Sequence, residues 1–234
     1  MIDAKKLLTQ FLGSQIPGIG GSVRKRGDDA ASYAKSNPWK TGALVSVLLG
    51  TKTGRSLAGG ALKVGGLALV AGLGYRAYRN YQSGKAPEEL RALPELPAPP
   101  ENSGFDPATS LSNDFALTLI KAMIAAAKAD GHIDEGERAN IMEKLHVEEL
   151  GDEAEAFIRA ELDNPTDLDA LVAAARTEEQ KVELYTASRL TIDPDTRAER
   201  GYLDLLAGRL GLADGLIDHI EATVAAAKVE TPAV

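Results

Sequence analysis

The feature that most constrains this chain is a long apolar stretch rich in glycine. Residues 57–75 read LAGGALKVGGLALVAGLGY, with Lys63 as their one charge. At about 1.5 Å per residue, a helix over them is about 28 Å long, close to the ~30 Å of bilayer hydrocarbon. Tyrosines alternate with arginines directly after it, as at a membrane interface. The stretch predicts a single-pass transmembrane helix over residues 57–81.

Glycines recur through this segment and favour close contacts between helices. Ala61 and Gly65 lie four residues apart, a spacing that lets two membrane helices approach each other. We therefore expect self-association through the Gly-rich helix. The alternative is a glycine-rich helical hairpin buried in a soluble protein, although each glycine costs a helix in water about 1 kcal/mol relative to alanine.

Charge is divided unevenly along the chain, whose formal net charge is -8. Up to Pro87 there are 13 basic and 3 acidic residues, and beyond it 13 basic and 31 acidic residues. Residues 1–56 are predicted to form a basic region with short amphipathic helices. The apolar run at residues 41–50 within it is too short to span a bilayer. The basic residues favour anionic lipid over nucleic acid as a partner. They flank both ends of the apolar stretch, so they do not assign the side of the membrane.

Two regions of different character follow. Residues 82–109 hold 6 of the 11 prolines and predict an extended linker. Over residues 110–230 the apolar side chains return at helical spacing, as at Phe115, Leu119 and Met123, and no segment alternates with period two. Glycine and proline separate these periodic segments. The pattern predicts an all-α chain whose acidic C-terminal domain is a bundle of six or seven helices.

A short acidic motif, ADGHIDEGE at residues 129–137, resembles the later half of a calcium-binding loop. Asp130, Asp134 and Glu137 occupy later positions of that loop, but its two earlier carboxylates are missing. The same residues fit a structural role. Gly131 would end one helix in a left-handed conformation, and Asp134 with Glu137 would cap the next.

A second acidic segment, TIDPDTRAERGYLDLLAGRL, precedes another amphipathic helix. If the two helix starts converge, their carboxylates face one another, which a divalent cation such as calcium would stabilise. The alternative is that Asp193 caps the helix and Pro194 occupies its first position. Both interpretations stay open. The candidate metal ligands are Asp130, Asp134, Glu137, Asp193, Asp195 and Glu199.

Signatures of catalysis are absent from the sequence. Without cysteine, the chain has neither disulfides nor thiolate metal sites. His132, His146 and His219 are scattered, which favours exposed structural roles over a zinc site. There is no Gly-x-Ser-x-Gly elbow and no Walker loop. We expect a protein that is not an enzyme.

The motifs together resemble those of the YebE-like bacterial inner-membrane proteins of unknown function. The resemblance is carried by MIDAKKLLTQFLG, the Gly-rich segment, the Pro-rich linker, ALTLIKAMIAAAKADGHIDEGERANIMEKL and ELYTASRLTIDPDTRAERGYLDLLAGRLGL. The soluble domain of that family is similar to the tellurite-resistance protein TerB. The resemblance implies a TerB-like helical bundle whose acidic motifs form a metal-associated surface.

Two hypotheses about function follow. In the first, a membrane-anchored, non-enzymatic protein of the bacterial inner membrane presents its acidic domain to a divalent cation, a partner protein or both, in an envelope or metal-stress response. In the second, a membrane-tethered scaffold self-associates through the Gly-rich helix, and the acidic residues only cap helices. A cation that binds only the native state would raise the melting temperature in the first case.

Overall fold

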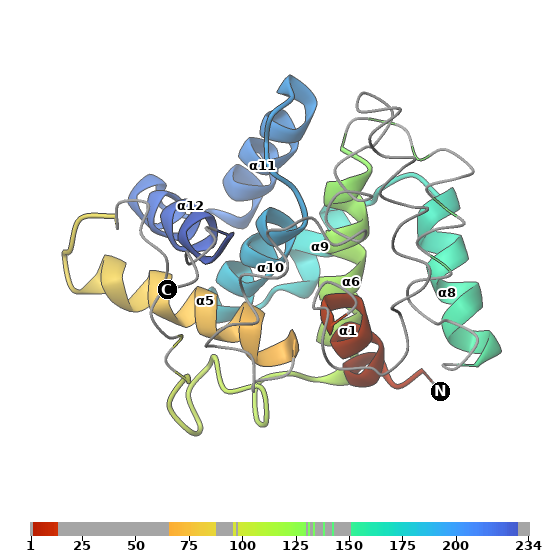
Figure 1. Ribbon diagram of the computed structural model, residues 1–234, viewed down its shortest axis with the longest axis horizontal. Helices are drawn as coiled ribbons and strands as arrows, with labels where there is room; N and C mark the ends of the chain where they lie inside the picture. Colours follow the sequence, from red (N-terminus) through yellow and green to blue (C-terminus); the bar gives the residue numbers. More distant parts are fainter. Residues whose placement is uncertain are drawn as a thin grey trace, which may run out of the picture.

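The computed structural model describes residues 2–13, 66–87, 96, 98–129, 131, 133, 138, 142 and 151–228. Every regular element in this part of the chain is a helix (Figure 1), which confirms the predicted all-α class for it. The helices are α1 (Ala4–Gly13), α5 (Gly66–Gln82), α6 (Asn113–Ala127), α8 (Asp152–Asp163), α9 (Leu168–Ala174), α10 (Glu178–Thr191), α11 (Arg197–Leu210) and α12 (Asp214–Lys228).

The C-terminal region folds as its apolar periodicity predicts. Its described residues form six helices, α6 and α8 to α12. α6 buries Phe115, Leu119 and Met123, which follow one another at four-residue spacing. The predicted breaker Gly211 ends α11 in the left-handed conformation, with φ 69°, which glycine adopts without steric cost. Gly151, with φ 86°, stands directly before α8.

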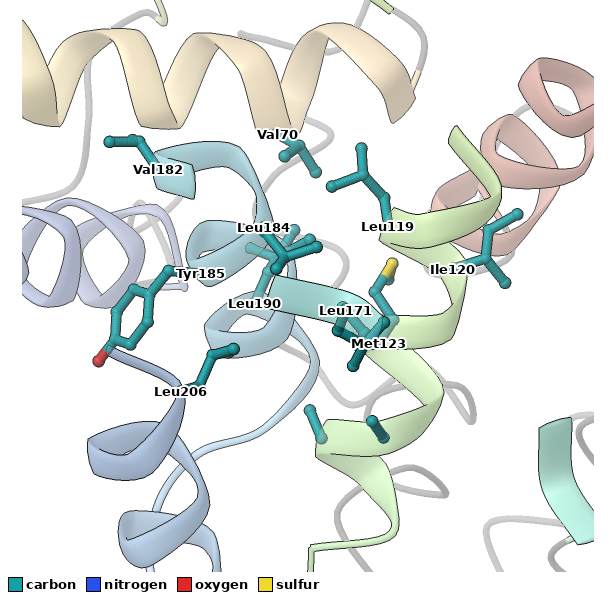
Figure 2. Packing of buried hydrophobic residues seen from close by; sticks show 14 of the residues in the cluster. Val70, Leu119, Ile120, Met123, Leu171, Val182, Leu184, Tyr185, Leu190 and Leu206 are labelled. Carbon is teal, nitrogen blue, oxygen red and sulfur yellow. The ribbon is translucent and has the colours of Figure 1, made fainter. Parts of the chain in front are cut away.

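α10 is the central helix of the core. Every residue from Val182 to Ile192 is buried, so this helix is covered on all sides. Its neighbours are α5, α6, α11 and α12. Figure 2 shows Leu184 and Leu190 among the labelled apolar side chains of the cluster that α10 shares with α6. Burial of each such side chain contributes about 1.5–3 kcal/mol, so this cluster is a large part of the stability.

α5 belongs to the same core, and it begins later than the transmembrane helix predicted over residues 57–81, whose residues 57–65 lie outside the described part of the chain. The helix covers Gly66–Gln82 and packs on α1, α10 and α12. Leu69, Val70 and Leu73 lie buried in the core cluster. Among the residues that the structure describes, no helix is both long enough and apolar enough to cross a bilayer. In the described part of α5, other helices of the chain cover its apolar face.

Glycine brings α5 and α10 close together within one chain. A Cβ atom added at Gly74 would lie 3.3 Å from Val182 Cγ1 and 3.5 Å from Phe105 Cε1, so only a residue without a side chain fits easily. This arrangement matches the alternative of a glycine-rich helix buried in protein. Self-association through the remaining glycines stays a prediction.

Residues 98–112 form a chain of turns instead of the extended linker that their prolines predict. The Asp106 carboxylate accepts backbone hydrogen bonds from Asn102 at 2.8 Å and from Ala108 at 3.0 Å. These bonds lower the pKa of Asp106, because they stabilise the charged form. Phe105 is buried, with its ring centroid 5.9 Å and 5.5 Å from two tyrosine rings of α5. The loop therefore covers α5 with an aromatic cluster.

α1 is amphipathic, as predicted, and docks on α6. Leu7 and Leu8 are buried in the core cluster. Asn113 at the start of α6 accepts a hydrogen bond from the Ala4 amide at 2.9 Å and donates one to the Ile2 carbonyl at 3.1 Å. The described parts of the N-terminal and C-terminal regions therefore share one core.

Candidate functional site

A groove is lined by residues of α6, of the end of α8 and of the start of α9; Figure 1 shows these three helices. Its volume is about 450 Å³, within the ~300–1,000 Å³ typical of ligand sites. We call it the acidic groove. Its apolar lining is formed by Leu117, Ile124, Ala125, Pro165, Ala170 and Leu171. Its charged lining is formed by Asp114, Lys121, Glu161 and Asp167.

One side of the acidic groove is a face of α6. The Ser112 hydroxyl caps this helix by accepting a hydrogen bond from the Phe115 amide at 3.1 Å. From that start, Asp114, Thr118 and Lys121 follow at helical spacing and line the groove. Other core residues of α6, such as Phe115, Leu119 and Met123, do not line the groove. A single amphipathic helix thus supplies both core and groove.

Two lysines fasten the end of α8 to α6. Lys121 Nζ lies 2.8 Å from Glu161 Oε1 and 5.5 Å from the centroid of the Phe157 ring. Lys128 Nζ donates to the Glu161 carbonyl at 3.0 Å and also to the Asn164 carbonyl. Burial lowers the pKa of Lys128, although the charge of Glu161 opposes this effect. A cation at the end of α8 satisfies carbonyls that have no partner within the helix.

The third side begins at Asp167, which caps α9. The Asp167 carboxylate accepts a hydrogen bond from the Ala170 amide at 2.9 Å, which fixes the first turn of this short helix. One turn further on, Leu171 is buried in the core cluster, where Figure 2 shows it beside Met123 of α6. This contact holds α9 against α6 and sets the width of the groove.

Charge in the acidic groove is not balanced. Its described lining carries the carboxylates of Asp114, Glu161 and Asp167 against the ammonium of Lys121. Lys121 pairs with Glu161, and neither Asp114 nor Asp167 has an ion pair with a described cation. Two carboxylates therefore remain on the rim of an apolar floor. This arrangement fits a ligand that has both an apolar stem and a positive charge.

The second acidic segment places its residues at the start of α11, where the predicted cap is wrong. Thr196, not Asp193, is the N-cap. Its hydroxyl accepts from the Glu199 amide at 3.1 Å, and Glu199 Oε2 accepts from the Thr196 amide at 2.9 Å. This reciprocal pair is a capping box. The Glu199 carboxylate is therefore engaged in the cap of α11. Asp195 is exposed.

Asp193 is held by two cations of the chain itself. Its Oδ1 lies 2.7 Å from Lys228 Nζ and 3.3 Å from Arg189 Nη1. Burial alone would raise the pKa of Asp193, but the charges of Lys228 and Arg189 outweigh it and lower the pKa. A metal ion at Asp193 Oδ1 would compete with both cations for this atom.

Comparison with known proteins places the chain in a family. The family described as "Protein of unknown function (DUF533)" matches residues 35–224. The chain belongs to the DUF533 family. One relative, described as "Uncharacterized protein in ampR 5'region" of Yersinia enterocolitica, is 33% identical over 103 residues, which are 44% of this chain and 74% of that protein. No solved structure matches the chain. The match supports the predicted resemblance at the level of an uncharacterised, TerB-like family.

The first acidic motif of this DUF533 chain lies almost wholly outside the described residues. Asp130, Asp134 and Glu137 belong to the undescribed part, so the six-carboxylate site stays a prediction. Gly131 has the predicted positive φ, 90°, although α6 ends earlier, at Ala127. Within the described ranges, no group of three or more histidines or carboxylates could hold a metal ion.

His219 differs from its predicted exposure. It is 4% exposed, and its ring meets that of Tyr81 edge to face at a centroid distance of 6.0 Å. The contact joins α12 to the end of α5 and is structural. His132 and His146 lie outside the described residues.

Sequence reasoning did not find the acidic groove. Its two unpaired carboxylates are distant along the chain and each looks like an ordinary residue at a helix start. The spacing of Asp114, Thr118 and Lys121 does indicate a polar face on α6. Only the packing of α8 and α9 on that face shows that it lines a groove.

Proposed function

We propose that the protein is a non-enzymatic binding module whose acidic groove receives a lysine- or arginine-bearing segment of a partner protein. The observation that carries this proposal is the pair of unpaired carboxylates, Asp114 and Asp167, on the rim of an apolar floor. Lysine and arginine have a long apolar stem and a charged head. The apolar methylene groups of such a side chain would contact the apolar lining of the groove, and its charged end would pair with the carboxylates of Asp114 and Asp167.

The charge of the whole C-terminal region supports a basic partner. Beyond Pro87 the chain has 31 acidic and 13 basic residues. Such an excess attracts positively charged partners over several ångströms and raises their association rate. The described lining of the groove contains no histidine, cysteine or serine.

Removing either rim charge is expected to weaken basic-peptide binding about tenfold, because a hydrogen bond to a charged group contributes ~1.5–3 kcal/mol. Twelve-residue peptides displayed on phage would be selected on the full-length protein, and their affinities measured by fluorescence anisotropy. Asp114→Asn removes one charge at constant shape. Asp167→Ser removes the other and keeps a hydroxyl that can cap α9.

The matched control is Asp218→Asn on the exposed face of α12, which leaves the groove unchanged. We expect the selected peptides to be rich in lysine and arginine and to bind this control as tightly as wild type. Peptides without basic residues, or equal affinity for all four proteins, would show that the acidic groove is not the site.

Membrane attachment is a second candidate, supported by the sequence ahead of α5. We propose that residues 41–50, TGALVSVLLG, insert into the surface of the bacterial inner membrane between Lys40 and Lys52. A basic segment with an apolar face binds anionic lipid through both features. The apolar face of α5 is already covered by protein, so the attachment would rest on this earlier run.

Leu48→Asp is expected to lower binding to vesicles about tenfold, because insertion of one leucine contributes ~1.5–3 kcal/mol. The measurement is co-sedimentation of the full-length protein with phosphatidylglycerol vesicles. Leu205→Asp makes the same chemical change at a side chain that is 51% exposed on α11 and should bind like wild type. If wild type does not sediment with these vesicles, or both variants behave alike, residues 41–50 are not the attachment.

A further inference from the structure

A carboxyl group is buried in the central helix without a partner. Glu183 of α10 is 3% exposed, and its Oε2 has no hydrogen-bond partner. Arg189 on the same helix pairs with Glu221 and Asp193 instead. Burying an ionised carboxylate without a counter-charge is very costly. The protonation state of Glu183 therefore matters for the stability of the core.

Two other buried oxygens near this helix also lack partners. They are Thr186 Oγ1 and Ser103 Oγ. Thr186 faces α5, because a Cβ at Gly74 would lie 3.6 Å from its Oγ1. The residue after Ser103 touches α10, because a Cβ at Gly104 would lie 2.5 Å from Glu179 Cδ.

The spacing along α10 places Glu183 between these contacts. Glu179, Glu183 and Thr186 stand at positions i, i+4 and i+7 and share one stripe of the helix. The first of them meets the loop of residues 98–112, and the last meets α5. The stripe is thus the surface on which the loop and α5 rest, and Glu183 is in its middle.

We propose that Glu183 is a proton-dependent latch: its neutral carboxylic acid lets the loop of residues 98–112 and α5 close on α10, and loss of the proton loosens this contact. A neutral acid can donate as well as accept a hydrogen bond. An ionised one can only accept, and it would have to recruit water into a sealed contact. Loosening is expected in the loop first, since it is held mainly by turns of its own.

The surrounding charges favour the neutral form. Burial, together with the neighbouring charge of Glu179, raises the pKa of Glu183 to about 8. Among the described charged groups on the packed elements, Glu179 is the one that acts on this pKa. The charged residues on those elements are Arg76 and Arg79 of α5, Glu101 and Asp106 of the loop, Asp114 and Lys121 of α6, Arg197, Glu199, Arg200, Asp204 and Arg209 of α11, and Asp214, Asp218, Glu221 and Lys228 of α12.

The sign of the pH effect follows from this raised pKa. An ordinary glutamate, with a pKa of 4.5, represents the unfolded chain. Between pH values of about 4.5 and about 8, Glu183 keeps its proton in the folded protein but has released it in the unfolded chain. The free energy of unfolding therefore falls as pH rises through this range. Above this pH range Glu183 is ionised in both the folded and the unfolded protein, and the loss of stability is complete.

The test compares wild type with Glu183→Gln in the full-length protein, by urea unfolding from pH 5 to pH 9. The amide of glutamine mimics the neutral acid. Between pH 5 and pH 8, we expect the unfolding equilibrium constant of wild type to rise about tenfold per pH unit relative to the variant. Hydrogen exchange in residues 98–112, corrected for its intrinsic pH dependence, should rise with pH in wild type and stay level in the variant.

Glu179→Gln gives a second, independent test, because it keeps Glu183. Loss of the neighbouring charge should lower the pKa of Glu183 and end the loss of stability at a lower pH. A difference between wild type and Glu183→Gln that does not change with pH would overturn the latch. Full rescue of wild type at pH 9 by calcium or sodium would also overturn it, since the carboxylate would then be a cation site.

Discussion

Replacing Leu73 with arginine is expected to lower the free energy of unfolding by about 4 kcal/mol or more. Leu73 is 0% exposed in the core cluster, on a helix that packs against α1, α10 and α12. An arginine there would bury its guanidinium without a counter-charge or force α5 out of the core. For a chain of this size each kcal/mol lowers the melting temperature by about 2–4 °C, so circular dichroism would detect the change easily.

The matched control is Leu73→Met, which keeps size and polarity and should cost less than about 1.5 kcal/mol. The pair also distinguishes core from bilayer. If α5 were in lipid, Leu73→Arg would release the protein from membranes but leave the melting of the helical region unchanged. That result would contradict the packing of α5 described above.

The helices that sequence analysis predicted well are those with one polar face. In α6, α11 and α12 the apolar residues recur at helical spacing while polar and charged side chains occupy most of the remaining positions, so periodicity identifies both the helix and its buried side. α5 lacks this contrast. Its first turns are apolar all round, and such a helix is equally suited to lipid and to a protein core. Its buried partner Phe105 lies in a segment that proline content marks as a linker.

The candidate sites show the same limit for a different reason. The T-x-x-E pattern of Thr196 and Glu199 is a local capping signature, so the start of α11 was predictable from neighbouring residues. The partners of Asp193 were not, because Lys228 is at the far end of α12. The same holds for the acidic groove, whose rim combines α6 with α9. Local chemistry is readable in a sequence, whereas long-range charge pairing requires the fold.

Arg189→Met is the second substitution with a large expected effect, about 2–3 kcal/mol, because breaking a buried ion pair leaves charges without partners. The Arg189 side chain is 8% exposed. Its Nε lies 2.5 Å from Glu221 Oε2, and its Nη1 donates to the Ile192 carbonyl at 2.8 Å. Glu221 also accepts from the Tyr185 hydroxyl at 2.8 Å. We place the cost below the ~3–5 kcal/mol of fully buried pairs, since Glu221 and Asp193 are partly exposed.

Urea unfolding of Arg189→Met, Glu221→Gln and the double variant would measure this network as a cycle. We expect the double variant to lose clearly less free energy of unfolding than the sum of the two single variants, because each single substitution leaves the other charge without its partner. The pKa of Asp193 is lower in the folded state than its ordinary value of 3.8. The pairing of Asp193 therefore contributes to the free energy of unfolding at pH values above 3.8, and this contribution is lost as the pH falls below that value. Arg189→Met should therefore lose less stability than wild type on acidification from pH 5 to pH 2. Additive losses, or equal acid sensitivity, would mean that Arg189 acts by packing alone.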